Sequence, residues 1–200
     1  MFTGIVESVG KVTQIQEEGS NKHITMQADF VDELKIDQSI THNGVCLTVV
    51  DIKDGEYTVT AVDETLQKSN LGNLHQEDMV NLERSVTMNQ FLDGHLVQGH
   101  VDQTAICKKI NFKDGSWEFT FQYDKNTPFI TIEKGSISVN GISLTVVNSR
   151  DDHFSIAVIP YTYEHTNFKQ MKEGDVVNLE FDVVGKYIQK LVEKQSGLKG

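Results

Sequence analysis

The chain has 200 residues, of which 38% are hydrophobic and 24% are charged, and this composition excludes an intrinsically disordered protein. Eighteen basic and 29 acidic residues give a formal net charge of −11, which argues against binding to nucleic acids or to anionic membranes. The length allows one large domain or two domains of roughly 100 residues each. Its two cysteines, Cys46 and Cys107, are too few for a disulfide framework or for a zinc site of four cysteines.

The first ten residues, MFTGIVESVG, predict neither a secretory signal peptide nor a myristoylation site. They lack a basic region followed by a long apolar run, and the glycine stands at position 4 rather than 2. Nowhere do about 18 apolar residues follow one another, as a membrane-spanning helix requires. We therefore expect a cytoplasmic protein with reduced cysteines.

Three segments in the first half of the chain alternate apolar and polar residues with a period of two, which is typical of half-buried strands. They lie at residues 5–15, 24–30 and 57–62. Asn-Gly at 43–44 and Asp-Gly at 54–55 indicate turns between strands. Residues 64–74 predict a short helix followed by a loop, and the polar stretch around residues 85–94 predicts a linker.

Two histidines, His95 and His100, follow this linker in the sequence HLVQGH. A spacing of five residues directs side chains apart on a strand and on a helix, so we do not expect the two to share a metal ion. Each is expected to be a turn or hydrogen-bonding residue. A histidine beside a pocket can still donate or carry a proton near neutral pH.

The second half of the chain repeats the first. SITHNGVCLTVV at residues 39–50 returns as SISVNGISLTVV at 136–147, shifted by 97 residues and identical at eight of twelve positions. The same shift aligns the two VNLE segments, at residues 80–83 and 177–180, and near the N-terminus a shift of 95 aligns Gly4 with Gly99. Collinear matches over about 80 residues indicate a tandem duplication of one small domain.

The second copy carries the same elements as the first. Strands are predicted at residues 117–123, 142–147 and 154–160, and a short helix with a loop at 163–171. Short strands at this spacing favour a small closed barrel, which also removes exposed sheet edges.

Cys46 fits two interpretations, a nucleophile activated by a histidine and a hydrogen-bonding group. Its repeat counterpart is Ser143, and hydrogen bonding survives an exchange of Cys for Ser better than nucleophilic chemistry does. Strand alternation places Cys46 with Thr48, and Ser143 with Thr145, on one face. We favour two related small-molecule sites, one in each copy, over the alternative that these are ordinary strand residues.

Four carboxylates at matching positions of the two copies are interpreted as turn residues and solvated faces: Asp78, Glu83, Asp175 and Glu180. No G-x-x-x-x-G-K and no G-x-G-x-x-G motif occurs. Nucleotide hydrolysis and dinucleotide binding therefore have no support.

The C-terminal segment differs from both copies and predicts an amphipathic helix. Its apolar residues recur at helical spacing, at Val183, Val184, Tyr187, Ile188, Leu191 and Val192. Such a helix must bury its apolar stripe, either on its own barrel or against neighbouring chains. Both alternatives remain open, and self-association is the more specific one.

Five segments together resemble the riboflavin synthase family: MFTGIVE, NGVCLTVV, GHLVQGHVD, KGSISVNGISLTVV and the VNLE pair. The resemblance covers residues 1–190. It implies an all-β fold of two tandem six-stranded Greek-key barrels plus a C-terminal α-helix. The implied domains are an N-terminal lumazine-binding barrel at residues 1–94, a C-terminal lumazine-binding barrel at 95–183, and a C-terminal helix and tail at 184–200. It also implies a homotrimer joined through the helices, with each active site between the N-barrel of one subunit and the C-barrel of its neighbour.

The activity implied by the resemblance is a dismutation that needs no metal and no organic cofactor. Two molecules of 6,7-dimethyl-8-ribityllumazine exchange a four-carbon unit and give riboflavin and 5-amino-6-(ribitylamino)uracil. The first alternative is a relative that only binds a lumazine or flavin, but the retained Thr3, Cys46, His95 and His100 favour the enzyme. A second alternative is a two-barrel carrier of another small molecule. The resemblance leaves an association with lumazine synthase open.

The resemblance also assigns candidate site residues. Those expected to take part in the chemistry are His100, Thr3, Ser39, Cys46 and Thr48, with His100 the first candidate for the base. The substrate-binding residues expected at the N-barrel are Phe2, Gly4, Ile5, Val6, Leu47, Thr60, Ala61, Val62, Asp63, Glu64, Thr65, Gly99 and Val101. Those expected at the C-barrel are Lys134, Ser143, Leu144, Thr145, Ile159, Pro160, Tyr161, Thr162, Tyr163 and Glu164.

The sequence departs from the family pattern at two places. Asp93-Gly94-His95 stands where Gly-Gly-His is usual, a loop change of small expected consequence. Pro160-Tyr161-Thr162-Tyr163 stands where Pro-Glu-Thr-Leu is common. The second change questions a ligand contact by the side chain at 161, but not one by the backbone.

Overall fold

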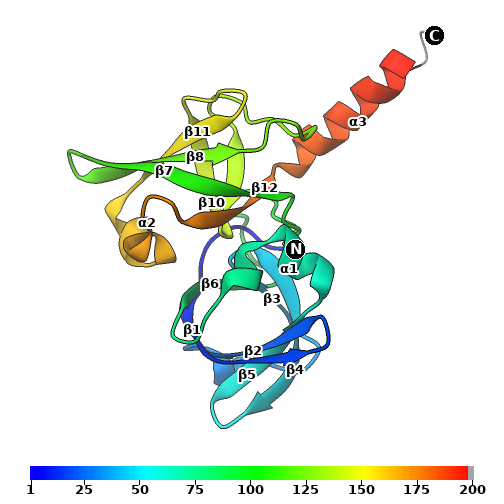
Figure 1. The fold of residues 1–200 in the computed structure, drawn as a ribbon, viewed down its shortest axis with the longest axis vertical. Coiled ribbons are helices and arrows are strands. Elements are labelled where there is room, and N and C mark those ends of the chain that lie inside the picture. The colour runs from blue at the N-terminus through cyan, green and yellow to red at the C-terminus, as the bar shows by residue number, and fades with distance from the viewer. Residues whose placement is uncertain (198–200) are drawn as a thin grey trace.

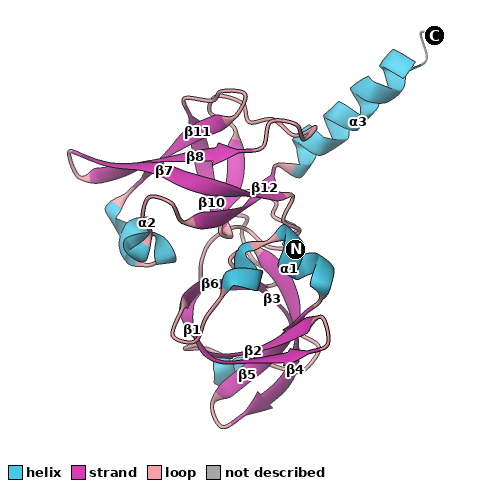
Figure 2. Ribbon diagram, in the orientation of Figure 1, coloured by secondary structure: helices cyan, strands magenta, loops and turns pink. Residues whose placement is uncertain are grey.

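Each half of the chain closes into an antiparallel barrel of six strands, as the repeat predicts (Figures 1 and 2). The computed structural model describes residues 1–197. The N-barrel consists of β1 (Ser8–Glu18), β2 (Asn21–Gln27), β3 (Ser39–His42), β4 (Val45–Lys53), β5 (Glu56–Ala61) and β6 (Met79–Arg84). Its ring order is β1-β2-β5-β4-β3-β6, so β6 returns beside β3 in a Greek key. A 3-10 turn at Val31–Glu33 follows β2, and α1 (Asp63–Lys68) with a 3-10 turn at Asn70–Asn73 joins β5 to β6.

The C-barrel repeats this topology. It consists of β7 (Gln103–Lys113), β8 (Ser116–Tyr123), β9 (Ser136–Val139), β10 (Ile142–Val147), β11 (His153–Val158) and β12 (Val176–Phe181). The connection from β11 to β12 contains α2 (Pro160–Glu164) and a 3-10 turn at Asn167–Gln170. Each barrel encloses its own cluster of buried apolar side chains, because alternate residues of every strand point inward.

The expected strands and turns agree with the structure, with shifted ends. β11 ends at Val158 rather than continuing to residue 160, because Pro160 takes the first position of α2, where its missing N–H is tolerated. The helix expected at 163–171 therefore begins earlier and is followed by a separate 3-10 turn. Residues 85–94 contain no helix and no strand, in agreement with the expected linker.

The barrels meet at their two Asn-Gly turns. Gly44 and Gly141 each have a φ of +79°, and a Cβ added to either glycine would lie 2.7 Å from the backbone nitrogen of the other. This contact therefore admits only glycine on both sides.

Six buried or partly buried asparagines surround this contact in three repeat-related pairs: Asn43 with Asn140, Asn70 with Asn167, and Asn81 with Asn178. A hydrogen bond that one asparagine makes to the other barrel is repeated by its counterpart in the second copy. The Asn70 backbone N–H donates to the Asn178 side chain (2.6 Å), and the Asn167 N–H donates to the Asn81 side chain (2.8 Å). The network thus relates the two barrels by a pseudo-twofold axis.

The C-terminal helix α3 (Val183–Gly197) projects away from both barrels (Figure 1). Its first turn is tied to the C-barrel, where Lys186 bonds Asp102 at 2.6 Å. Large apolar side chains of its predicted stripe are more than half exposed, at Val184, Tyr187, Ile188, Leu191 and Val192. The helix therefore does not bury this stripe on its own barrel, and the first of the two alternatives is wrong for the single chain.

Candidate functional site

A cavity of about 280 Å³ opens beside the N-barrel, where β4, α1 and the segment before β7 meet. It is lined by Val45, Cys46, Glu64, Thr65, Lys68, Ser69, Gly99, His100 and Val101. The structure thus brings together six residues that the sequence predicts for the N-barrel site: Cys46, Glu64, Thr65, Gly99, His100 and Val101. We call this cavity the N-barrel pocket.

Cys46 lies on the outward face of β4, whereas Leu47 beside it packs into the barrel core. Burial raises the pKa of the Cys46 thiol above its ordinary value, and a hydrogen bond with Ser39 on β3 only partly opposes this shift. The thiol is therefore protonated at neutral pH, and only the thiolate is a good nucleophile. This environment favours the hydrogen-bonding interpretation.

One wall of the pocket is formed by Gly99, His100 and Val101. They belong to residues 97–101, which follow the linker at residues 85–94 and which we call the linker segment. The Cys46 N–H donates a hydrogen bond of 2.8 Å to the Gly99 carbonyl, so this segment extends the edge of β4. Gly99 has a φ of +83°, and a Cβ at this position would lie 2.5 Å from the Cys46 Cβ. The backbone of the linker segment therefore lies so close to Cys46 that only glycine fits at position 99.

The N-terminal segment (residues 2–6) makes the equivalent approach to the C-barrel. The Ser143 N–H donates to the Gly4 carbonyl at 2.7 Å, Gly4 has a φ of +76°, and Val6 packs against the C-barrel core. Gly4 and Val6, which the resemblance assigns to the N-barrel site, therefore lie against the C-barrel in this chain. The shift of 95 residues contained the signal, because it equates Gly4 at Ser143 with Gly99 at Cys46.

The two segments also contact each other and cover internal side chains. Phe2 pairs with Val97 in an isolated bridge, and its ring is fully buried. Thr3 is 2% exposed, and its hydroxyl donates to Glu83 at 2.7 Å. Both side chains are buried in the single chain, and their expected contact with substrate stays a prediction.

Two carboxylates expected on solvated faces are buried instead. Glu83, on β6, is 4% exposed and accepts hydrogen bonds from Thr3 and Gly4. Glu180, the equivalent residue on β12, is 2% exposed and accepts bonds from the linker segment. Strand alternation did not reveal this burial because distant backbone, rather than the barrel core, covers these residues. Asp78 and Asp175 do accept turn N–H groups, as expected.

His95 is expected to be a turn or hydrogen-bonding residue and is not among the assigned site residues, but it contacts one of them. Its Nδ1 lies 2.7 Å from the Ser143 hydroxyl, and burial lowers the pKa of its ring. Neutral imidazole can accept or donate a proton at this contact. The repeat offered no signal, because a shift of 95 residues places the counterpart of His95 before Met1.

The rims of the two sites differ chemically. At the N-barrel pocket, Glu64 and Lys68 form an ion pair of 2.6 Å within α1. At the corresponding positions of α2 and the residue after it, the Tyr161 and His165 rings stack with centroids 4.1 Å apart. Position 161 thus presents an aromatic ring where the first copy presents a carboxylate.

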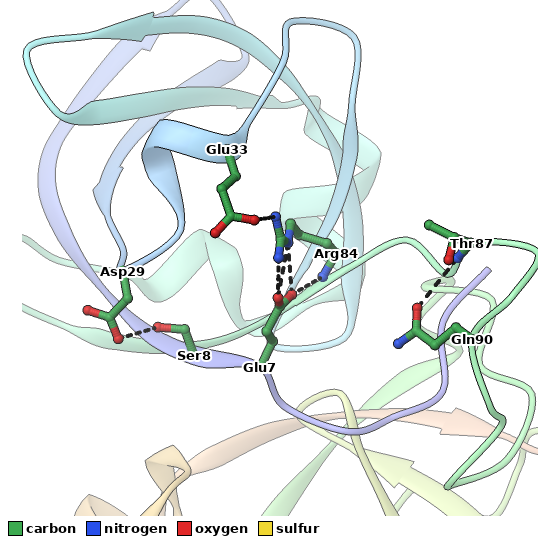
Figure 3. Close-up of polar contacts among 7 residues, drawn as sticks. All are labelled: Glu7, Ser8, Asp29, Glu33, Arg84, Thr87 and Gln90. Atoms are coloured by element: carbon green, nitrogen blue, oxygen red, sulfur yellow. Dashed lines mark hydrogen bonds and ion pairs between the residues drawn. The ribbon is translucent and has the colours of Figure 1, made fainter.

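A second hollow of about 390 Å³ lies beside the linker at residues 85–94, and Ile5, which is 47% exposed, lines it. Figure 3 shows Arg84 at this place, between Glu7 and Glu33. The guanidinium donates to Glu7 at 3.0 Å and to Glu33 at 2.9 Å. Since its one cationic side chain is already paired twice, we regard this hollow as structural.

The remaining predicted residues lie at varied depths. Leu47 and Ala61 are buried in the N-barrel core, so only their backbone can face a ligand. Partly buried residues are Thr60, Leu144, Thr162 and Tyr163. Exposed residues are Thr48, Val62, Asp63, Lys134, Thr145, Ile159, Pro160 and Glu164.

Two classes of feature are not found in the described part of the chain. Residues 1–197 contain no cluster of three histidine, cysteine or acidic residues that would bind a metal ion. None of the helices among these residues is both long and apolar enough to cross a membrane.

Known proteins match this chain over nearly its whole length. The lumazine binding domain family matches twice, at residues 3–85 and 98–182. The riboflavin synthase of Actinobacillus pleuropneumoniae is 40% identical over 196 residues, which cover 98% of this chain and 91% of that protein. The Mycobacterium tuberculosis riboflavin synthase is 41% identical over 202 residues, covering 96% and 98%.

The chain belongs to the riboflavin synthase family. Its two lumazine binding domains correspond to the two barrels. The fold is also that of LumP, whose structure with 6,7-dimethyl-8-(1'-D-ribityl) lumazine superimposes with a TM-score of 0.82 at 21% identity, covering 90% of this chain and 98% of LumP. The LumP complex with riboflavin gives 0.84 at 21% identity, covering 90% and 99%.

Membership of the riboflavin synthase family gives the duplication a chemical meaning. Each barrel presents a strand bearing Cys46 or Ser143, faced by a glycine carbonyl from a crossing segment. The two barrels thus present the same backbone arrangement with different side chains.

Proposed function

We propose that this chain catalyses the dismutation of two 6,7-dimethyl-8-ribityllumazine molecules to riboflavin and 5-amino-6-(ribitylamino)uracil, the last step of riboflavin biosynthesis. The observation that carries the proposal is the pair of repeat-related sites, at Cys46 and at Ser143, in a member of the riboflavin synthase family. A reaction that uses one substrate in two roles needs two similar sites. Holding both molecules in register removes much of the entropic barrier of a bimolecular step.

The chemistry would begin at the acidic 7-methyl group of one lumazine, whose carbanion is delocalised into the ring. We propose His100 as the first candidate for the base, because its exposed side chain lines the N-barrel pocket. Ser39, Cys46 and Thr48 would supply hydrogen bonds from adjacent strands. At the other site, His95 and Ser143 would polarise the second lumazine.

We further propose that the functional unit is a homotrimer in the cytoplasm, with the N-barrel of one subunit facing the C-barrel of its neighbour. The exposed stripe of α3 supports self-association. The domain limits at residues 94 and 183 belong to this proposal. So does an association with lumazine synthase, which co-purification with that enzyme would test.

The function is tested by incubating the purified protein with 6,7-dimethyl-8-ribityllumazine as the sole substrate. We expect riboflavin to form, followed by its absorbance, together with an equal amount of 5-amino-6-(ribitylamino)uracil. Binding of the lumazine without turnover would instead assign the chain to the non-catalytic lumazine-binding proteins.

A further inference from the structure

The carboxylate of Glu180 is buried at the end of β12 and accepts three backbone hydrogen bonds. The donors are the N–H groups of Gln98 (2.6 Å), Gly99 (2.9 Å) and His100 (2.8 Å). Burial raises the pKa of Glu180, and the three donors oppose that shift. Burying a carboxylate is costly unless it is hydrogen-bonded, and these three backbone donors offset that cost.

The residues that Glu180 binds contact the other barrel. Gln98, Gly99 and His100 belong to the linker segment, whose Gly99 carbonyl accepts the Cys46 N–H of the N-barrel. Gly99 and His100 also line the N-barrel pocket. A carboxylate of the C-barrel therefore fixes a wall of the pocket on the N-barrel.

The first copy makes the reciprocal arrangement. Glu83, on β6 of the N-barrel, accepts bonds from the Thr3 N–H (2.6 Å), the Thr3 hydroxyl (2.7 Å) and the Gly4 N–H (2.9 Å). The carbonyl of Gly4 in turn accepts the Ser143 N–H of the C-barrel. Each barrel thus holds, through one buried glutamate, the backbone that completes the site of the other.

We propose that Glu83 and Glu180 are positioning residues that act crosswise: Glu180 orders the N-barrel pocket around Cys46, and Glu83 orders the C-barrel site around Ser143. The identity of the ligand, a lumazine, rests on the proposed function. The crosswise positioning by the two glutamates does not depend on it. A glutamine at either position would turn an amide NH₂ toward at least one N–H donor, which breaks a bond and opposes two donors.

The test compares Glu180→Gln with Glu83→Gln, two equivalent substitutions in equivalent surroundings, in the full chain. Amide hydrogen exchange is measured at Cys46 and at Ser143. We expect Glu180→Gln to accelerate exchange at Cys46 about tenfold with little change at Ser143, and Glu83→Gln to give the reverse. Equal acceleration at both amides in each variant would overturn the crosswise assignment, because it would indicate a general loss of stability.

A second readout concerns the N-barrel pocket alone. Alkylation of Cys46 by iodoacetamide, followed by mass spectrometry, should be faster in Glu180→Gln than in Glu83→Gln, while the fully buried Cys107 remains unmodified. The lumazine concentration that half-protects Cys46 should rise only in Glu180→Gln. Identical rates and identical protection in the two variants would contradict the proposal.

Two controls separate folding and function from positioning. In the wild-type protein the amides of residues 98–100 should exchange slowly, and fast exchange there would overturn the proposal even if neither variant folds. If the wild-type protein forms no riboflavin, the proposed reaction fails, whereas the exchange and ligand-free alkylation rates still decide the crosswise role.

Discussion

The sulfur atom of Cys46 can act as a hydrogen-bonding group or as a nucleophile, and exchanging it for oxygen distinguishes these two roles. Because its thiol is protonated and bonds Ser39, we expect Cys46→Ser to retain kcat/KM within about tenfold of the wild-type value, the range of one altered neutral hydrogen bond. Cys46→Ala, which removes the donor without adding bulk, should lose more. Steady-state riboflavin formation measures both. Complete loss of turnover in Cys46→Ser with unchanged lumazine binding would indicate a nucleophile instead.

Individual site residues were predictable where a local pattern carried the information. Alternation placed Cys46 outward and Leu47 inward on β4, and the structure agrees. Glu83 and Glu180 were misjudged because the backbone that buries them comes from segments about 80 residues away in the chain. His95 was not assigned to a site for a similar reason, since it lies outside the strands and its partner Ser143 is 48 residues further along the chain, in β10.

Between strands β3 and β5, one polar pair distinguishes the N-barrel core from its copy. His42 Nε2 and the Tyr57 hydroxyl lie 2.9 Å apart, and both residues are almost fully buried. Burial lowers the pKa of His42 from 6.5 to about 4. The equivalent residues of the C-barrel are Val139 and Phe154, which cannot titrate.

This pair predicts a pH-dependent stability. Between about pH 6.5 and 4 the unfolded chain carries a proton on His42 that the folded chain lacks, so stability is lost as the pH falls through this window. The loss due to His42 amounts to roughly 3 kcal/mol. Urea unfolding at pH 7 and pH 4.5 should show it, and His42→Val/Tyr57→Phe, which copies the C-barrel, should show correspondingly less. An equal loss in both proteins would contradict this assignment.

Strands and their connections were predictable to different degrees. Period-two alternation located strands such as β2 and β8, because one face of each strand packs on a core. Short strands at this spacing favoured a closed barrel, and the resemblance supplied the number of six strands and their Greek-key order. The crossing of residues 2–6 to the C-barrel did not follow from alternation, since this segment forms no ladder with its own barrel and is fixed by Glu83 and Ser143.

For the whole molecule, duplication was evident in the sequence, but the way the copies meet was not. Three asparagines per copy recur at a shift of 97, and nothing in a single copy distinguishes a junction residue from a turn residue. In the structure each pairs across the pseudo-twofold axis, as when the Asn178 side chain donates to the Asn43 carbonyl at 2.8 Å. The pairing is a property of two copies together.

The same holds for α3, whose apolar stripe faces solvent in the single chain. Val184, Tyr187, Ile188 and Leu191 are each more than half exposed, and burying such side chains against copies of themselves contributes favourable free energy of association. Deleting residues 184–200 should therefore lower the mass measured by light scattering from that of a trimer toward that of a monomer, while both barrels keep their circular dichroism. Ile188→Lys with Leu191→Lys should act in the same direction without shortening the chain. An unchanged mass in both variants would mean that this stripe does not drive self-association.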